Sequence, residues 1–149
     1  MKKELYTEIE IAAPPEKIWQ ILTDFENYPN WNPFIRRIRG ASAVGAKLEV
    51  FIQPAGAKGM TFKPTLLAVE KEKELRWRGK FFVSGLFDGE HFFKIQPLAE
   101  NRAKFVHGEN FKGLLVGFLA KSLDTDTLRG FREMNEALKL LAENKKDVD

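Results

Sequence analysis

The feature that most constrains this chain is a change of hydrophobic period near Gly113. From about residue 36 to residue 112, apolar and polar residues alternate, as they do in β-strands that bury one face. Beyond Gly113, apolar residues recur from Leu123 to Ala142 at the spacing of one helix face, which predicts a single long amphipathic helix. Because a sheet must cover its apolar face, we expect this helix to pack across the sheet.

The alternation predicts seven strands, at residues 3–12, 36–42, 46–54, 59–70, 74–82, 88–97 and 102–112. Between the first two, Pro15 suits the first turn of a helix over about residues 15–23, and Asp24 is placed to cap a second, short helix. Turns this short favour antiparallel neighbours, and a sheet of seven twisted strands curls. We therefore predict one α+β domain over residues 1–149, with a seven-stranded curved antiparallel sheet around the C-terminal helix and a hollow between them.

The composition narrows the classes of function. The chain has no cysteine, which excludes disulfides, thiolate catalysis and cysteine-ligated metal sites. Its net charge of +3 comes from lysines and arginines interleaved with acidic residues, so we expect no nucleic-acid partner. No segment resembles a signal peptide or a membrane span, which predicts a cytoplasmic protein. Thirteen phenylalanines and three tryptophans indicate either a large core or a cavity shaped for an apolar guest.

The parity of the last three strands predicts which side chains face the hollow, because successive residues of a strand point to opposite faces. In the hairpin near Ala99-Glu100, the numbers of opposed residues sum to about 199, so His91 lies opposite residues 107–109 at ~5 Å. We therefore expect His91, His107 and Glu109 to cluster. With the apolar face of the C-terminal helix added, the predicted lining is Trp77, Phe81, His91, Phe93, Phe105, His107, Glu109, Phe111, Leu123, Thr127, Phe131 and Met134.

The expected cluster of His91, His107 and Glu109 allows three interpretations. Its polar groups can anchor the polar end of a ligand or hydrogen-bond to one another. They can also act as general acids and bases, since histidine titrates near neutral pH. Two histidines and a carboxylate can bind a metal, but their spacing matches no known metal motif, so no metal is predicted. No serine has a context that suggests an activating base, and we expect no cofactor.

Two apolar segments that contain glycine, residues 81–87 and 113–119, are expected at the same end of the sheet. One interpretation makes them the paired lips of a mobile entrance, which could also contact a membrane or a partner protein. The other interpretation makes them ordinary turns of the core. The pattern favours neither, and it carries no signal for an oligomeric state.

Four segments of the chain carry a family resemblance. They are Ile9–Phe25 with the following Tyr28-Pro29-x-Trp31-Asn32-Pro33, then Gly89–Ile95, Phe105–Leu115 and Phe131–Lys139. In this order they are similar to the opening, the later strands and the closing helix of the polyketide cyclase/dehydrase-like group of the START-like superfamily. The resemblance covers nearly the whole chain, and it implies a helix-grip fold whose hollow holds a hydrophobic or aromatic ligand.

The residues and the resemblance together lead to three hypotheses about function. The first is binding or transport of a small hydrophobic molecule, whose polar end is held by His91, His107 or Glu109. The second is a cyclase or dehydratase that acts on a polyketide-like or aromatic substrate through proton transfer by the same residues. The third is a module that binds a protein or a membrane through its apolar lips.

Overall fold

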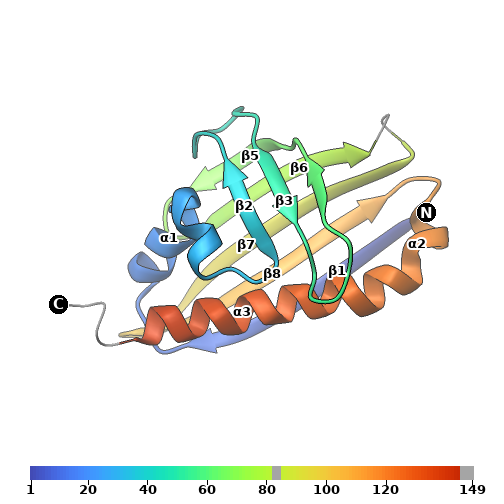
Figure 1. Cartoon of the computed structure of the whole chain (residues 1–149). Coiled ribbons are helices and arrows are strands. Elements are labelled where there is room, and N and C mark those ends of the chain that lie inside the picture. The colour runs from blue at the N-terminus through green and yellow to red at the C-terminus, as the bar shows by residue number, and fades with distance from the viewer. Residues whose placement is uncertain (82–84, 145–149) are drawn as a thin grey trace.

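The described residues, 1–81 and 85–144 of a computed structural model, form two sheets and a long helix (Figure 1). This composition confirms the predicted α+β class, with two short helices after the first strand and the long helix at the C-terminal end. In chain order, the elements are β1 (Lys2–Ile11), α1 (Pro15–Thr23), the 3₁₀ helix η1 (Phe25–Asn30), β2 (Ile35–Arg39), β3 (Glu49–Ile52), β4 (Met60–Phe62), β5 (Thr65–Glu70), β6 (Glu74–Phe81), β7 (Phe87–Ala99), β8 (Arg102–Lys112), α2 (Val116–Ser122), the π helix η2 (Leu123–Thr127) and α3 (Leu128–Glu143).

The strands are divided differently from the single seven-stranded sheet that the alternation predicts. In the part of the chain that the structure describes, β1-β8-β7-β6-β5 form an antiparallel five-stranded sheet and β2-β3-β4 form a three-stranded one, so eight strands replace seven. The predicted strand 59–70 is split into β4 and β5, because Pro64 has no N–H to donate to a strand ladder. An isolated antiparallel bridge joins Thr65, at the start of β5, to Lys47, which precedes β3.

The C-terminal helix is longer than predicted and begins before Leu123. The elements α2, η2 and α3 follow one another directly from Val116 to Glu143. As the amphipathic stripe predicts, α3 lies against β1 and β8 with one apolar face buried. Figure 1 shows α2 beside the N-terminus, at the end of the molecule opposite the C-terminus. None of the helices in residues 1–81 and 85–144 is long and apolar enough to cross a membrane.

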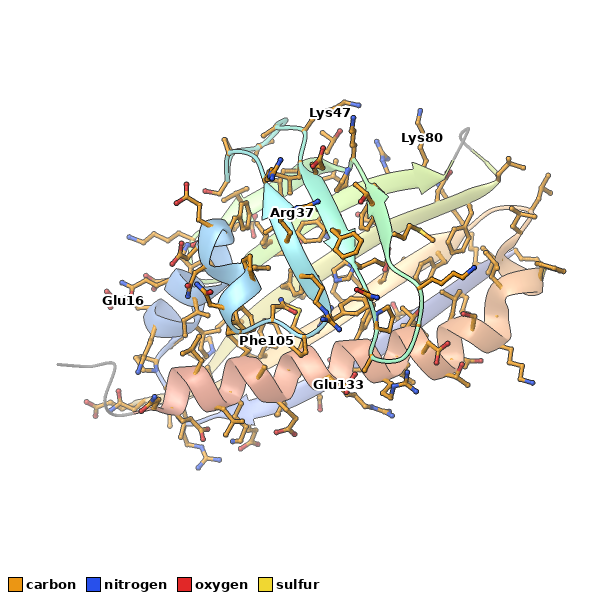
Figure 2. All side chains as sticks on the ribbon, in the orientation of Figure 1. Glu16, Arg37, Lys47, Lys80, Phe105 and Glu133 are labelled. Atoms are coloured by element: carbon orange, nitrogen blue, oxygen red, sulfur yellow. The ribbon has the colours of Figure 1, made fainter. Side chains whose placement is uncertain are left out.

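Aromatic rings fill the core between the five-stranded sheet and α3. Phe93, Phe105 and Phe131 are fully buried, and the ring of Phe131 stacks on that of His107 with the centroids 4.1 Å apart. Figure 2 shows Phe105 between the sheet and α3, whereas the charged side chain of Glu16 lies at the periphery. Such close ring contacts leave little room beneath the middle of α3.

A close contact between Gly130 and Phe34 helps to hold the three-stranded sheet against α3. Gly130 lies on the buried face of α3, and a Cβ atom at this position would overlap the ring of Phe34. Because glycine has no side chain, Phe34 reaches the helix and meets the ring of Phe131 edge-on, with centroids 5.4 Å apart. This contact sets the distance between α3 and the start of β2, which directly follows Phe34.

Candidate functional site

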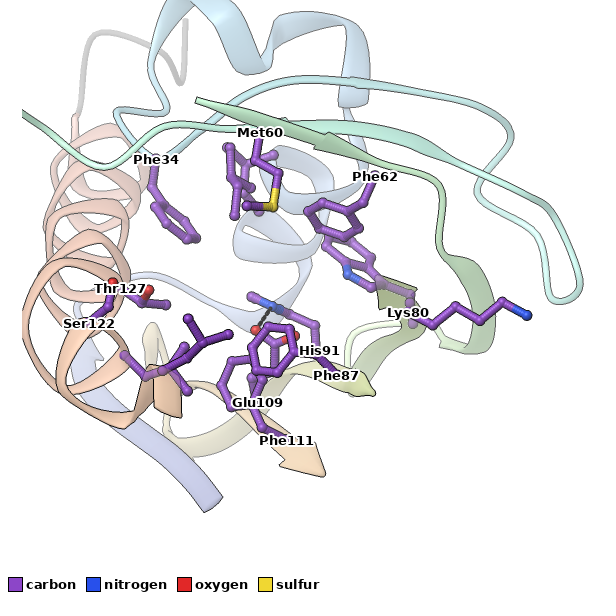
Figure 3. A pocket seen from close by; sticks show the side chains of 17 residues that line it. Phe34, Met60, Phe62, Lys80, Phe87, His91, Glu109, Phe111, Ser122 and Thr127 are labelled. Atoms are coloured by element: carbon purple, nitrogen blue, oxygen red, sulfur yellow. Dashed lines mark hydrogen bonds and ion pairs between the residues drawn. The ribbon is translucent and has the colours of Figure 1, made fainter. Parts of the chain in front are cut away.

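A cavity of about 160 Å³ lies between the two sheets and the helical segment around η2 (Figure 3). Figure 3 shows that Lys80 directs its side chain away from the cavity, which leaves Glu109 and His91 as the ionisable groups on the described wall. The rest of the wall is largely apolar. In chain order, the wall is formed by Phe34, Ile35, Ile52, Met60, Phe62, Trp77, Gly79, Lys80, Phe87, Gly89, His91, Glu109, Phe111, Leu119, Ser122, Leu123 and Thr127.

The side chains predicted to line the hollow fall into two groups. Those on the cavity wall are Trp77, His91, Glu109, Phe111, Leu123 and Thr127. Those buried in the adjoining core, away from the wall, are Phe93, Phe105, His107, Phe131 and Met134. Parity places the strand residues of both groups on the inner face, but it does not say where rings close the space. The cavity therefore lies near η2, and not beneath the middle of α3. The side chain of Phe81 lies outside the described residues.

The wall also includes side chains of the three-stranded sheet that the sequence analysis did not identify. Ile52 of β3 is paired with Met60 of β4. Phe62 is two residues after Met60, so its side chain points to the same face of β4, and all three residues line the cavity. The alternation of apolar and polar residues in these strands predicts that one face of each strand is buried. Which face is covered depends on how the second sheet folds over the first, and the local pattern does not contain this information. Met60 is 45% exposed and marks the rim of the cavity.

The structure brings His91, His107 and Glu109 together, as the hairpin register predicts. β7 and β8 pair His91 directly with Glu109. The Nδ1 atom of His91 lies 3.1 Å from Oε1 of Glu109, and its Nε2 atom lies 2.8 Å from Nε2 of His107. The ring of Trp77 stacks on that of His91 with centroids 5.1 Å apart. His91 is thus held on three sides, between a carboxyl group, an imidazole and an indole.

The cluster continues into a buried hydrogen-bond chain that ends on β1. Nδ1 of His107 lies 2.9 Å from Oδ1 of Asn135, on the buried face of α3. Nδ2 of Asn135 donates to Oγ1 of Thr7 at 2.8 Å, and Thr7 donates to the backbone carbonyl of His107 at 2.7 Å. The pairing of Asn135 and Thr7 with His107 is not predicted by the sequence pattern, because it depends on the packing of α3 against β1 and β8. One continuous chain therefore runs from the cavity wall to the core.

Burial keeps the ionisable groups of this cluster uncharged. It raises the pKa of Glu109 to about 8 and lowers the pKa of His91 to about 3. Burial and the neighbouring His91 hold the pKa of His107 well below its ordinary value. The Glu109 side chain is 14% exposed and that of His91 4% exposed, so the carboxyl group is the more accessible of the two. At neutral pH the cavity therefore presents a protonated carboxyl group next to neutral imidazoles.

The metal interpretation of the cluster finds no support in its geometry. No group of three or more acidic or histidine side chains is arranged for a metal ion within residues 1–81 and 85–144. The facing Nε2 atoms of His91 and His107 are close enough to bond to each other, so neither is free to coordinate.

The two apolar segments considered as lips lie side by side where they are described. Leu114 and Leu115 donate backbone hydrogen bonds to the carbonyls of Gly85 and Leu86, at 3.0 and 2.9 Å. Leu114 is 79% exposed, and Phe118 on α2 is 87% exposed. Residues 82–84 lie outside the described residues. The segments thus adjoin the cavity end of the fold, and their opening and closing stays a prediction.

Comparisons with solved structures place this fold among START-like proteins. A START superfamily protein from Mycobacterium smegmatis has 22% sequence identity and a TM-score of 0.73, over 94% of this chain and 97% of that one. The Zhui aromatase/cyclase from Streptomyces sp. R1128 has 16% identity and a TM-score of 0.78, over 96% and 94%. A point mutant of norcoclaurine synthase from Thalictrum flavum has 15% identity and a TM-score of 0.73, over 95% and 94%. At these identities the likeness is one of fold.

Comparison at the level of sequence gives the family. No curated protein matches the chain. The family described as polyketide cyclase / dehydrase and lipid transport matches residues 2–143, which is nearly the whole chain. The START-like fold agrees with this match and with the resemblance of the opening and closing segments. The chain belongs to the polyketide cyclase/dehydrase and lipid transport family.

Proposed function

We propose that this protein binds a small apolar molecule in the cavity between its two sheets. The observation that carries the proposal is an apolar wall, contributed by both sheets and by η2, around a single carboxyl–imidazole pair. A volume of about 160 Å³ is close to that of an engineered cavity of roughly 150 Å³ that binds benzene. One six-membered ring therefore fits without rearrangement. Removal of its surface from water drives binding, at about 25 cal/mol per Å² before entropy losses.

The kinds of protein that share the fold support this proposal. The family description names both lipid transport and cyclisation, and the similar structures include an aromatase/cyclase and norcoclaurine synthase. Transport and cyclisation both require a molecule to enter the protein. Binding in the cavity is therefore the step that the family's functions have in common.

Two threonines of η2 offer a matched test of binding. Thr127 lines the cavity, whereas Thr125 is exposed on the same segment. Benzene, toluene and phenol are titrated into the protein, and dissociation constants are measured by NMR chemical shifts. Thr127→Phe places a ring in the cavity and should weaken binding at least about tenfold, while Thr125→Phe should bind as the wild type does. Binding that Thr127→Phe leaves unchanged, or no binding to the wild type, overturns the proposal.

Acid–base catalysis in the same cavity is the second candidate function. Its supporting observation is the pair of Glu109 and His91, in which a proton can move across a 3.1 Å contact beside the cavity. The test is the double variant His91→Gln and His107→Gln, assayed for ligand affinity and for cyclisation of a short poly-β-ketone. If the protein is a carrier, the double variant keeps most of its affinity for the ligand, and neither the wild type nor the variant cyclises the substrate. An enzyme loses turnover while it still binds.

Contact with a membrane or a partner protein is the third candidate. It is supported by Leu114 and Phe118, two large apolar side chains left exposed beside the cavity end of the fold. Lys112 and Lys121 are exposed close to them in the sequence, and cations next to apolar side chains suit a surface of anionic lipids. Such a contact is compatible with binding, because a carrier must receive its molecule from somewhere.

A further inference from the structure

The buried chain that begins at Thr7 has a fixed hydrogen-bond direction. A backbone carbonyl only accepts, so the hydroxyl of Thr7 must give its single hydrogen to the carbonyl of His107. Thr7 can then only accept from Asn135, which must turn its NH₂ group toward Thr7 and its Oδ1 toward His107. Because Oδ1 only accepts, Nδ1 of His107 carries a hydrogen. The orientation of one hydroxyl thus determines the tautomer of a histidine across the core.

The direction of the hydrogen bonds is also fixed from His107 to the cavity wall. With its hydrogen on Nδ1, neutral His107 presents a bare Nε2, which accepts from Nε2 of His91 at 2.8 Å. Neutral His91 then has a bare Nδ1, which faces Oε1 of Glu109 at 3.1 Å. Two lone pairs at this distance repel each other, so a proton must lie between them. Whether Glu109 or His91 holds this proton, it is shared through Oε1.

The second oxygen of Glu109 is therefore an acceptor in either case. Oε2 has no hydrogen-bond partner among the described residues, and the carboxyl group lies on the cavity wall. Gly89 makes room for it, because a Cβ atom at position 89 would overlap Oε2. On the described wall, Oε2 of Glu109 is thus a fixed acceptor without a partner. Trp77, on the same wall, has a buried Nε1–H donor without a partner.

From this direction of hydrogen bonding, we infer that the cavity selects a neutral single-ring molecule with a hydroxyl donor, as in a phenol, and rejects carboxylates. The inference rests on the proposed binding function and specifies its ligand. The ring fills the apolar space, and the hydroxyl donates to Oε2 of Glu109. A carboxylate would set its lone pairs against those of Oε2 and would bring a charge into an apolar site. A ring without a donor leaves Oε2 unpaired.

The test compares phenol with toluene, which has the same size and lacks the donor, and with benzoate. Dissociation constants are measured at neutral pH for the wild type, Glu109→Gln and Glu109→Leu. The glutamine amide can donate to His91 and still turn its oxygen toward the cavity, so the toluene-to-phenol ratio of dissociation constants should stay within about threefold of the wild type. Leucine removes the acceptor, and the ratio should fall about tenfold, the effect of one hydrogen bond.

The outcomes separate this inference from the proposed function. Benzoate that binds as tightly as phenol, or a ratio that Glu109→Leu does not change, overturns the selectivity and leaves binding intact. If none of the rings binds, the proposed function fails and the inference with it. A second measurement needs no variant: ¹⁵N NMR should find the hydrogen of His107 on Nδ1 and that of His91 on Nε2. A hydrogen on Nε2 of neutral His107 would reverse the chain and refute the inference.

Discussion

The substitution Glu109→Gln should change how the stability of the protein depends on pH. In the unfolded chain, Glu109 loses its proton near pH 4.5, and His91 loses its own near pH 6.5. In the folded protein, burial raises the pKa of Glu109 to about 8. The proton on Glu109 thus stabilises the folded state fully below pH 4.5, and this stabilisation is lost as the pH rises to about 8. Glutamine does not titrate and removes this contribution.

The magnitude follows from the number of protons that each state holds. Between pH 4.5 and 6.5, the folded state carries one proton on Glu109 and the unfolded state one on His91, so these two groups nearly cancel. Between pH 6.5 and about 8, the folded state holds the Glu109 proton and the unfolded chain holds none on either group. Each pH unit then lowers the free energy of unfolding by about 1.4 kcal/mol, or about 2 kcal/mol over this interval.

The assay is urea denaturation at a series of pH values from about 6.5 to 8.5, followed by tryptophan fluorescence. The free energy of unfolding should fall by about 2 kcal/mol more in the wild type than in Glu109→Gln. Other titrating groups cancel in this difference. Glu136→Gln, which removes an exposed carboxylate of α3, is the control and should keep the decline of the wild type. A difference between wild type and Glu109→Gln that does not vary with pH refutes the buried, protonated carboxyl group.

Three further predictions concern other parts of the fold. Asn135→Leu removes the Oδ1 acceptor of His107 and the donor to Thr7 from a buried site, so denaturation should show a loss of about 1–3 kcal/mol; unchanged stability would contradict the buried chain. Alanine usually stabilises a helix interior by ~1 kcal/mol over glycine, but Gly130→Ala should destabilise this protein by about 1–3 kcal/mol, because the new Cβ meets the ring of Phe34. A gain in stability would show that the ring moves aside freely. Phe118→Ser removes a side chain that is 87% exposed, so stability should stay within about 0.5 kcal/mol while co-sedimentation with anionic vesicles falls; equal co-sedimentation argues against membrane contact.

The sequence alone was sufficient for the class of fold and for the central pair of the site. The alternation of side chains along a strand follows from the pleat, and the short turn near Ala99-Glu100 sets the pairing of the strands beside it. These two local rules place His91 opposite residues 107–109, and the structure pairs it with Glu109 within that range. The stripe from Leu123 to Ala142 likewise follows from the helical repeat. Each of these predictions depends only on residues that are close in sequence or joined by one turn.

The tertiary structure alone decided where the cavity lies and which groups face it. Phe93, Phe105 and Phe131 share the inner face with His91, yet they close the core, because whether rings leave a space depends on volumes contributed by several elements at once. The same holds for Asn135, which meets His107 only because α3 packs against β1 and β8. The periodicity of a sequence predicts the direction in which a side chain points from its own strand or helix. It does not predict which residues of other elements pack against that side chain.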